Sequence, residues 1–443
     1  MIQSFYCVRA SALLAGLVSA FFWSSVSADP IEPYADRYID LGLRFQNHDK
    51  SAYLFLCDPN LKQAAQADVT SLPELVLQLE DLAAELSALE QTMPEARKRI
   101  SDLNDRVVAM KVRGNILLGE TPNDFEEEVK LTFGVEVPHY DEAHFERLVA
   151  ELDKVVPGEG PLPARMERFR DEFRIPPERL EAVLSTAIEE CRRRTKAHLD
   201  LPPDENTRLA LVTGAHWVGF TVYMGDSFSV IQLSEDVPVH IERALELGCH
   251  EGYPGHHAHA SMLEAEVIKS RGWKEYQLIQ LLGPIAVMNE GAASYAVDLA
   301  FSPQERLAYE REALFPLAGM DLRDLKRYYH YINLVDALNY ARTEVARKYL
   351  YGGLSFDDSV EWLMRFGLET LGTATQRMRF IEAQRAYVVT YNYGKTLVKN
   401  YIEQKAGSNR SRRWDVFRDV ILTPMTPREL EAGVAPRANQ ADR

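Results

Sequence analysis

The sequence predicts a mainly helical protein. It should have a large helical body and one small β-sheet, which lies beside the helix that carries a group of histidines at residues 250–259. Apolar residues recur at steps of three and four between Leu75 and Met110 and again in later segments, which is the period of an amphipathic helix. Short β-rich runs separated by turn residues are confined to residues 209–233. The 443 residues are 46% apolar and 26% charged, a composition typical of a globular protein.

Residues 1–28 are predicted to be a signal peptide. Arg9 precedes a short apolar run from Ala12 to Trp23, and the small residues Val26-Ser27-Ala28 suit cleavage after Ala28. An uncleaved anchor helix is the alternative, although the run is short for a membrane span of about 20 residues. We therefore expect an exported protein, periplasmic or secreted, with no membrane span in its mature chain.

The charge balance argues against one class of partner. The chain has 50 Lys and Arg against 66 Asp and Glu, a formal net charge of −16. Neutralising phosphates requires a local surplus of cations, and no long stretch of this sequence supplies one. We therefore expect no nucleic-acid partner.

Three cysteines remain after removal of the signal peptide: Cys57, Cys191 and Cys249. They allow one disulfide at most, and a protein of this size does not require one for stability. If a disulfide forms, the candidate pair is Cys57–Cys191. Cys249 is interpreted as a small buried packing residue rather than a metal ligand.

Residues 29–200 form the predicted N-terminal helical region. Ser71 and Glu74 have the spacing of a capping box, and Pro94 should split the following apolar stripe into two helices. We interpret them as an antiparallel hairpin packed on the protein itself; a coiled-coil surface for a partner is the alternative. Further helices are expected at 141–155, 163–173 and 177–198.

Residues 201–423 form the predicted catalytic, metal-binding region. Strands are expected at 209–212, 219–224 and 228–233. Helices are expected at 274–282, 285–299, 303–313, 322–349, 355–367, 374–391 and 394–404. The polar segment 424–443 is expected to be a flexible tail.

Four of the 11 histidines lie within the ten residues from His250 to His259. Imidazole is the commonest protein ligand for zinc-like metals, and Glu251 could act as a base toward water beside such a metal. In the familiar His-Glu-x-x-His helix the two histidines are one turn apart. Here the next histidines are His256 and His257, six and seven residues after His250. A run of surface histidines without a metal is the alternative.

This spacing requires a break in the helix. On a straight α-helix, a residue six positions on is rotated by about 240°, and one seven positions on lies about 10 Å further along the axis. Pro254 and Gly255 would permit a widened or kinked helix that brings a later histidine back toward His250. We favour His256 as the second ligand, with His257 as the alternative.

Glu290 is the predicted third ligand. It lies in an apolar, small-residue helix between Met288 and Ala296, where a carboxylate without a partner would be costly to bury. Together with two histidines it would complete a set of ligands for one Zn²⁺ ion and leave one coordination position open, as in catalytic zinc sites. An arginine partner for Glu290 is the alternative.

The C-terminal third supplies polar groups suited to a carbonyl substrate. Arg385 and Arg342 are candidates to bind a substrate carboxylate through paired hydrogen bonds, and the hydroxyls of Tyr387 and Tyr391 are candidate donors to a developing oxyanion. The alternative is that these residues are ordinary salt-bridge partners and core aromatics.

These motifs together resemble a known family. The string His-Glu-Gly-Tyr-Pro-Gly-His-His at 250–257 follows the β segments and precedes the Asn-Glu-Gly-x-x-x-Tyr-Ala helix at 289–296. This combination resembles the metallopeptidases of domain-of-unknown-function family 885, which are similar to helical zinc peptidases of the carboxypeptidase Taq and oligopeptidase kind. The resemblance covers about residues 219–295. It implies His250, His256 and Glu290 as metal ligands and Glu251 as general base.

The chain also departs from that family. Members are longer and often carry a Gln soon after the histidine pair and a Gly-x-His element further on, whereas Ala260 and Leu350 stand near those places here. The sequence therefore resembles a short, divergent branch whose substrate can differ.

The expected function is that of an exported zinc-dependent hydrolase, specifically a peptidase. Glu251 would take a proton from the attacking water and return it to the leaving amine. A strand edge, such as that of 228–233, is a candidate to hold the peptide as an added strand. The alternatives are a metal-dependent amidase or other hydrolase of a small carbonyl substrate, and a non-catalytic exported protein that binds metal or a partner.

Overall fold

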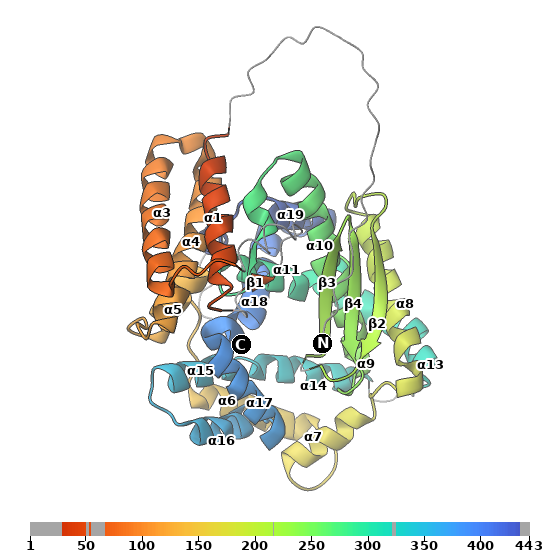
Figure 1. The fold of residues 1–443 in the computed structure, drawn as a ribbon. Helices are drawn as coiled ribbons and strands as arrows, with labels where there is room; N and C mark the ends of the chain where they lie inside the picture. The colour runs from red at the N-terminus through yellow and green to blue at the C-terminus, as the bar shows by residue number, and fades with distance from the viewer. Residues whose placement is uncertain (1–28, 50–52, 55–66, 216, 321–324, 435–443) are drawn as a thin grey trace.

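The computed structural model describes residues 29–49, 53–54, 67–215, 217–320 and 325–434, and it is mainly helical with a small sheet, as predicted (Figure 1). The predicted signal peptide and Cys57 lie outside the described residues. Within those ranges, no helix combines the length and the apolar character needed to cross a membrane.

Among the described residues up to Lys196, the elements are helices and one two-residue strand. Its elements are α1 (Glu32–Phe45), β1 (Tyr53–Leu54), α3 (Leu72–Thr92), η1 (Pro94–Ala96), α4 (Arg97–Leu117), α5 (Phe125–Phe133), α6 (Glu142–Val155), α7 (Leu162–Asp171) and α8 (Pro177–Lys196). The predicted split at Pro94 is confirmed, because the single 3₁₀ turn η1 separates α3 from α4. Ser71 precedes α3 as expected, but no cap hydrogen bond to its side chain forms within the described chain.

The hairpin of α3 and α4 packs on the protein's own body. Leu79 and Leu86 of α3 and Leu103 and Met110 of α4 are fully buried, and together with α1 they form a small core. Leu278 also belongs to this core and joins the hairpin to the C-terminal half. The apolar stripe of the hairpin is therefore buried within the protein itself.

The predicted sheet consists of β2 (Asn206–Val212), β3 (Gly219–Gly225) and β4 (Phe228–Ser234). The strand order is β2-β4-β3, with β4 parallel to β2 and antiparallel to β3. The expectation that the segment 228–233 offers a free edge is wrong, because β4 has strands hydrogen-bonded on both sides. The edges of the sheet are β2 and β3.

Helices dominate the remainder of the chain. The elements are α9 (Ile241–Leu247), η2 (Gly248–Gly252), α10 (His256–Met262), η3 (Leu263–Ser270), η4 (Lys274–Gln277), β5 (Ile279–Gln280), α11 (Pro284–Ala300), α12 (Pro303–Tyr309), η5 (Glu310–Leu314), α13 (Phe315–Ala318), α14 (Leu325–Leu338), α15 (Ala341–Leu350), α16 (Phe356–Phe366), α17 (Leu371–Gln384), η6 (Arg385–Val388), α18 (Val389–Ala406), α19 (Arg410–Leu422) and α20 (Pro427–Ala432).

Three expectations for this half are corrected. The helix expected at 274–282 is instead a 3₁₀ turn followed by β5, which pairs antiparallel with β1. The helix expected at 374–391 breaks at Arg385, whose φ of 51° is left-handed. Part of the expected flexible tail is ordered: α20 buries Leu430, and Tyr393 donates a hydrogen bond of 2.6 Å to Glu431. Residues 435–443 lie outside the described residues.

The larger core extends across the boundary predicted at residue 200. It includes Phe125 and Leu184 from the first half and Tyr253, Tyr295 and Phe417 from the second, all fully buried. The segments on either side of residue 200 therefore share one interior, and α11 lies in it as a central helix.

Candidate metal centre

The helix that carries His250 widens and then breaks, as the sequence predicted. The α-helix α9 continues into the π-helical turn η2. Tyr253 is then extended, and α10 starts again at His256. At Gly255 the chain folds back so closely that an added Cβ would lie 1.9 Å from the carbonyl oxygen of His250. A residue with a side chain would not fit there, so Gly255 is required for the return of His256.

The break brings His256 back beside His250, and α11 brings Glu290 to both. Nε2 of His250 lies 3.4 Å from Oε2 of Glu290, and Nε2 of His256 lies 3.7 Å from Oε1 of Glu290. The two imidazole rings are perpendicular, with centroids 4.7 Å apart. One ligand atom from each residue lies within 4.8 Å of the others. The three predicted ligands therefore form one cluster.

The cluster lies deep but can be reached from solvent. The side chains of His250, His256 and Glu290 keep exposed fractions of 21%, 24% and 14%. Burial lowers the pKa of His250 and lowers that of His256 to about 4, so both imidazoles are neutral near pH 7 and retain a lone pair. Burial also raises the pKa of Glu290.

Glu290 supplies a structural test of whether a metal fits. Its Oε2 is buried and has no hydrogen-bond partner among the described residues, although it faces the nitrogen of His250. A buried carboxylate oxygen without a partner is costly, and a cation held between it and two neutral imidazoles would remove that cost. The donor set of two nitrogens and one carboxylate suits zinc.

Glu251 lies beside the cluster and is held by the sheet. Its Oε1 is 4.0 Å from Nε2 of His250. The hydroxyl of Thr221 on β3 lies 2.8 Å from both the backbone oxygen and Oε2 of Glu251 and can donate to either. Burial raises the pKa of Glu251, which favours proton uptake. Thr221 was not predicted, because it belongs to an ordinary β segment and no sequence motif marks it.

The two predicted tyrosines also lie at the centre, and Tyr387 contacts Glu290. Tyr387 donates a hydrogen bond of 3.4 Å to Oε1 of Glu290, and the rings of Tyr387 and Tyr391 meet edge to face at 5.7 Å. Burial raises the pKa of Tyr387 well above its ordinary value, so its hydroxyl remains a donor. Helices α11 and α18 approach closely here, since a Cβ added at Gly291 would lie 2.5 Å from the carbonyl oxygen of Gly394.

The two predicted substrate arginines are already paired with carboxylates of the protein. Arg385 donates to both oxygens of the buried Glu128 at 2.6 to 3.0 Å, so its charge is balanced within the fold. Arg342 donates to Glu369 at 2.9 Å. Arg377, which sequence reasoning passed over, lies 3.9 Å from the same Glu369, and its Nε has no hydrogen-bond partner within the described ranges.

The other two histidines of residues 250–259, His257 and His259, bind other groups of the protein. Both ring nitrogens of His257 are occupied, with Ser229 at 2.8 Å and Glu205 at 3.1 Å, and its side chain is fully buried. Nε2 of His259 lies 3.0 Å from the carbonyl oxygen of Ile421. The arrangement therefore favours His256 over His257 as the partner of His250.

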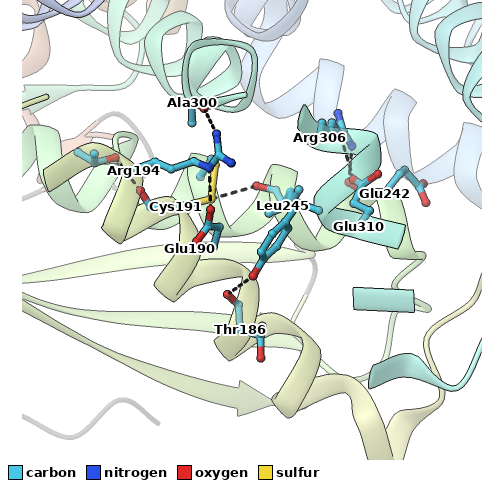
Figure 2. The surroundings of a disulfide bond; sticks show 12 residues. Thr186, Glu190, Cys191, Arg194, Glu242, Leu245, Ala300, Arg306 and Glu310 are labelled. Atoms are coloured by element: carbon cyan, nitrogen blue, oxygen red, sulfur yellow. Dashed lines mark hydrogen bonds and ion pairs between the residues drawn. A yellow bond between two sulfur atoms is a disulfide. The ribbon is translucent and has the colours of Figure 1, made fainter. Parts of the chain in front are cut away.

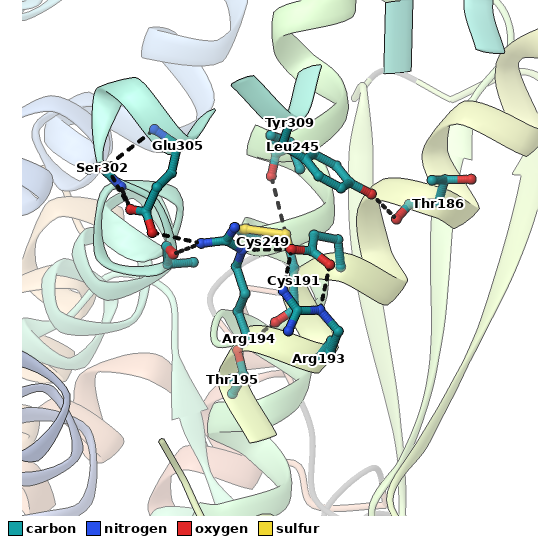
Figure 3. A network of polar contacts seen from close by, with 12 residues as sticks. Thr186, Cys191, Arg193, Arg194, Thr195, Leu245, Cys249, Ser302, Glu305 and Tyr309 are labelled. Atoms are coloured by element: carbon teal, nitrogen blue, oxygen red, sulfur yellow. Dashed lines mark hydrogen bonds and ion pairs between the residues drawn. A yellow bond between two sulfur atoms is a disulfide. The ribbon is translucent and has the colours of Figure 1, made fainter. Parts of the chain in front are cut away.

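A disulfide joins Cys191 of α8 to Cys249 of η2, immediately before His250 (Figure 2). The Cys57–Cys191 pair that the sequence left open is therefore wrong, although Cys249 is buried as expected. Next to the disulfide, Arg194 donates hydrogen bonds to Glu190 at 2.7 Å and to the carbonyl oxygen of Ala300 at 3.0 Å (Figure 2). Arg194 also lies 3.5 Å from Glu305 (Figure 3). Helix α8 is thus attached both to η2 and to the end of α11.

The sequence of this chain was compared with protein-family models and with curated proteins. No protein-family model and no curated protein matches the chain. The resemblance to family 885 therefore rests on the quoted motifs alone.

Solved structures similar to this chain include one from Colwellia psychrerythraea and one from Deinococcus radiodurans R1. A protein from Colwellia psychrerythraea described as a lipoprotein has 13% identity and a TM-score of 0.49, covering 82% of this chain and 69% of its own. The M32 carboxypeptidase from Deinococcus radiodurans R1 has 14% identity and a TM-score of 0.45, covering 91% of this chain and 94% of its own. Neither likeness bears on the chemistry of the centre.

Proposed function

We propose that the protein is a zinc-dependent hydrolase, and specifically a peptidase, with His250, His256 and Glu290 as the metal ligands. One observation carries the proposal: two neutral imidazoles converge on the carboxylate of Glu290, whose Oε2 is buried and has no hydrogen-bond partner among the described residues. Glu251, a carboxylate poised to take up a proton, lies beside them. This combination suits hydrolysis better than a purely structural metal site, which would need no adjacent base.

Each residue has a defined part in this proposal. When bound by His250, His256 and Glu290, zinc would supply Lewis acidity, which would favour attack by water on a carbonyl near pH 7. Glu251 accepts the proton of the attacking water on its carboxylate and later gives it to the leaving group. Thr221 orients that carboxylate through its hydroxyl. Tyr387 and Tyr391 offer phenol donors to the negative charge that develops on the substrate oxygen.

The sheet edge supports an extended peptide as substrate. β3 is paired with β4 on one side only, and its other edge pairs with no strand among the described residues. The side chain of Thr221 on β3 contacts Glu251, so this strand passes beside the proposed base. A peptide added along β3 would place its backbone carbonyls next to Glu251.

The arginine pair supports a substrate that carries a carboxylate. Arg342 and Arg377 share the single carboxylate of Glu369, at 2.9 Å and 3.9 Å, so these three groups together carry one unbalanced positive charge. Burial, followed by the charge of Arg342, lowers the pKa of Arg377 to about 10. A bound anionic group would relieve this repulsion. Arg385 is not part of this proposal, because Glu128 already neutralises it.

The test begins with metal content and hydrolysis. Purified protein should contain close to one zinc per chain, and it should cleave members of a mixed peptide library only while zinc is bound. Loss of cleavage on chelation and its return on adding zinc are the expected results. Cleavage of simple amides or esters without cleavage of peptides would favour the amidase alternative. Protein that binds no zinc and cleaves nothing would contradict an enzymatic function and favour a binding protein.

Export, proposed from residues 1–28, is tested by locating the protein in cell fractions.

A further inference from the structure

Glu205, a buried carboxylate outside the proposed metal centre, connects α8 to the break in the histidine-bearing helix. Its side chain is fully buried and lies just before β2. Oε1 faces α8, 3.0 Å from Arg192 and 2.6 Å from Lys196. Oε2 faces the break and accepts hydrogen bonds from the Tyr253 hydroxyl at 2.5 Å and from Nε2 of His257 at 3.1 Å.

The two residues bound to Oε2 flank the proposed ligand His256. Tyr253 is the last residue before the Pro254–Gly255 break, and His257 comes directly after His256. Their rings also contact each other, with centroids 4.9 Å apart. One carboxylate oxygen therefore holds both ends of the short segment that turns the chain back toward His250.

His257 is fixed from both sides. Because its Nε2 donates to a carboxylate, the Nδ1 of the neutral ring must accept a hydrogen bond, and the hydroxyl of Ser229 on β4 supplies it at 2.8 Å. The imidazole is thus held between the sheet and Glu205. This bonding uses all of its polar atoms, which is consistent with a residue that positions its neighbour.

We infer that Glu205 is a positioning residue for the metal centre: it holds Tyr253 and His257 so that His256 faces His250 and Glu290. This inference rests on the proposed function, because it concerns the geometry of the proposed ligands. Replacing Glu205 would release both ends of the segment and leave Arg192 and Lys196 without their shared carboxylate. Residues that orient metal ligands in this way typically contribute about 10- to 100-fold in metal affinity.

A matched control is available in Glu275 on η4. Its side chain is also fully buried, and it accepts two hydrogen bonds from Arg99, at 2.6 Å and 3.0 Å. Glu275→Gln therefore disturbs a comparable buried ion pair that, among the described residues, forms no hydrogen bond or ion pair with His250, His256 or Glu290. It separates a general loss of stability from a specific loss of ligand geometry.

The experiment measures zinc affinity and stability separately in the full chain. The dissociation constant for zinc is obtained by competition with a chromophoric chelator, and unfolding of the zinc-free protein is followed in urea. Glu205→Gln is expected to weaken zinc binding about tenfold or more. Tyr253→Phe, which removes one hydrogen bond and keeps the ring, should weaken it severalfold. Glu275→Gln should leave zinc affinity unchanged whatever its unfolding midpoint.

A second readout reports geometry directly. With cobalt(II) in place of zinc, the visible absorption spectrum of Glu205→Gln and Tyr253→Phe should differ from that of the wild type, whereas the spectrum of Glu275→Gln should not. Wild-type zinc affinity and spectra in both Glu205→Gln and Tyr253→Phe would overturn the inference and leave the proposed function intact. Equal weakening in Glu275→Gln would also overturn it. A wild-type chain that binds no zinc would overturn both.

Discussion

Nε2 of His250 lies 3.4 Å from Oε2 of Glu290, although the two residues belong to different helices. Two close approaches of the backbone accompany this contact at the centre. Gly255 allows η2 and α10 to fold back on each other, and Gly291 allows α11 to press against α18. Substitution of a ligand, or of Gly255 or Gly291, is therefore expected to disturb the proposed centre.

Replacing a proposed ligand should remove the metal. His256→Ala is expected to weaken zinc binding by more than about 100-fold, because it deletes one of three protein ligands. His259→Gln is the matched control, since that residue lies in the same helix and contacts the backbone of Ile421 instead. Zinc per chain after dialysis measures the effect. Full zinc content in a folded His256→Ala would show that the ligand set is wrong.

Replacing the proposed base should remove turnover without removing the metal. Glu251→Gln keeps the size of the side chain but cannot take up the proton, so the rate of peptide cleavage should fall by about 10²- to 10⁴-fold. Glu264→Gln serves as a control, because Glu264 is bonded to Tyr223 and lies outside the cluster. Steady-state rates at saturating zinc measure the difference. Near-normal turnover in Glu251→Gln would rule out this assignment.

A methyl group at the crossing of α11 and α18 should disturb both stability and metal binding. In Gly291→Ala the new Cβ would meet the carbonyl oxygen of Gly394, so the helices must move apart at a cost of about 1 to 3 kcal/mol. Gly372→Ala adds the same methyl in α17, where the described residues leave open space, and should be neutral or slightly stabilising. Urea unfolding and zinc affinity check both variants. Equal behaviour of the two alanine variants would contradict the proposed tight crossing.

Removing the disulfide should destabilise the fold. The bond closes a loop of sequence separation 58, and its loss in a Cys191→Ala/Cys249→Ala double variant should lower the free energy of unfolding by about 2 to 5 kcal/mol. Thermal unfolding with and without reductant provides the measurement. A wild-type melting temperature that does not respond to complete reduction would argue against a stabilising bond.

Acid should weaken the fold through Glu205. Burial alone would raise the pKa of this carboxyl, but hydrogen bonds from His257, Lys196, Tyr253 and Arg192 hold it at about 2, below the ordinary value of 4.5. The charged form therefore stabilises the fold above pH 4.5, and this contribution is lost as the pH falls toward about 2. Urea midpoints measured from pH 6 to pH 3 should fall less steeply in Glu205→Gln than in the wild type. Parallel curves would mean that Glu205 does not carry this effect.

Several features followed from the sequence because they depend on short-range constraints. Helical periodicity marked the α3–α4 hairpin, and Pro94 split it, since a proline cannot continue the hydrogen-bond pattern of a helix. The spacing of His250 and His256 required a widened helix, and Pro254 and Gly255 indicated where it would break. Glu290 stood out as a carboxylate in an apolar helix. Each of these conclusions concerns neighbours within a few turns of the chain.

Tertiary structure alone decided which distant groups meet. Cys191 pairs with Cys249, Arg385 is neutralised by Glu128, and β4 lies between two other strands; none of these choices is encoded locally. Thr221 and Glu205 carry no motif, because an ordinary threonine or glutamate gains importance only from what the fold places within hydrogen-bond distance. The sequence by itself determined the chemical groups and the local breaks that allow them to converge. The packing of α8, α11 and the sheet determined their partners, since long-range contacts are selected by the burial of the whole core.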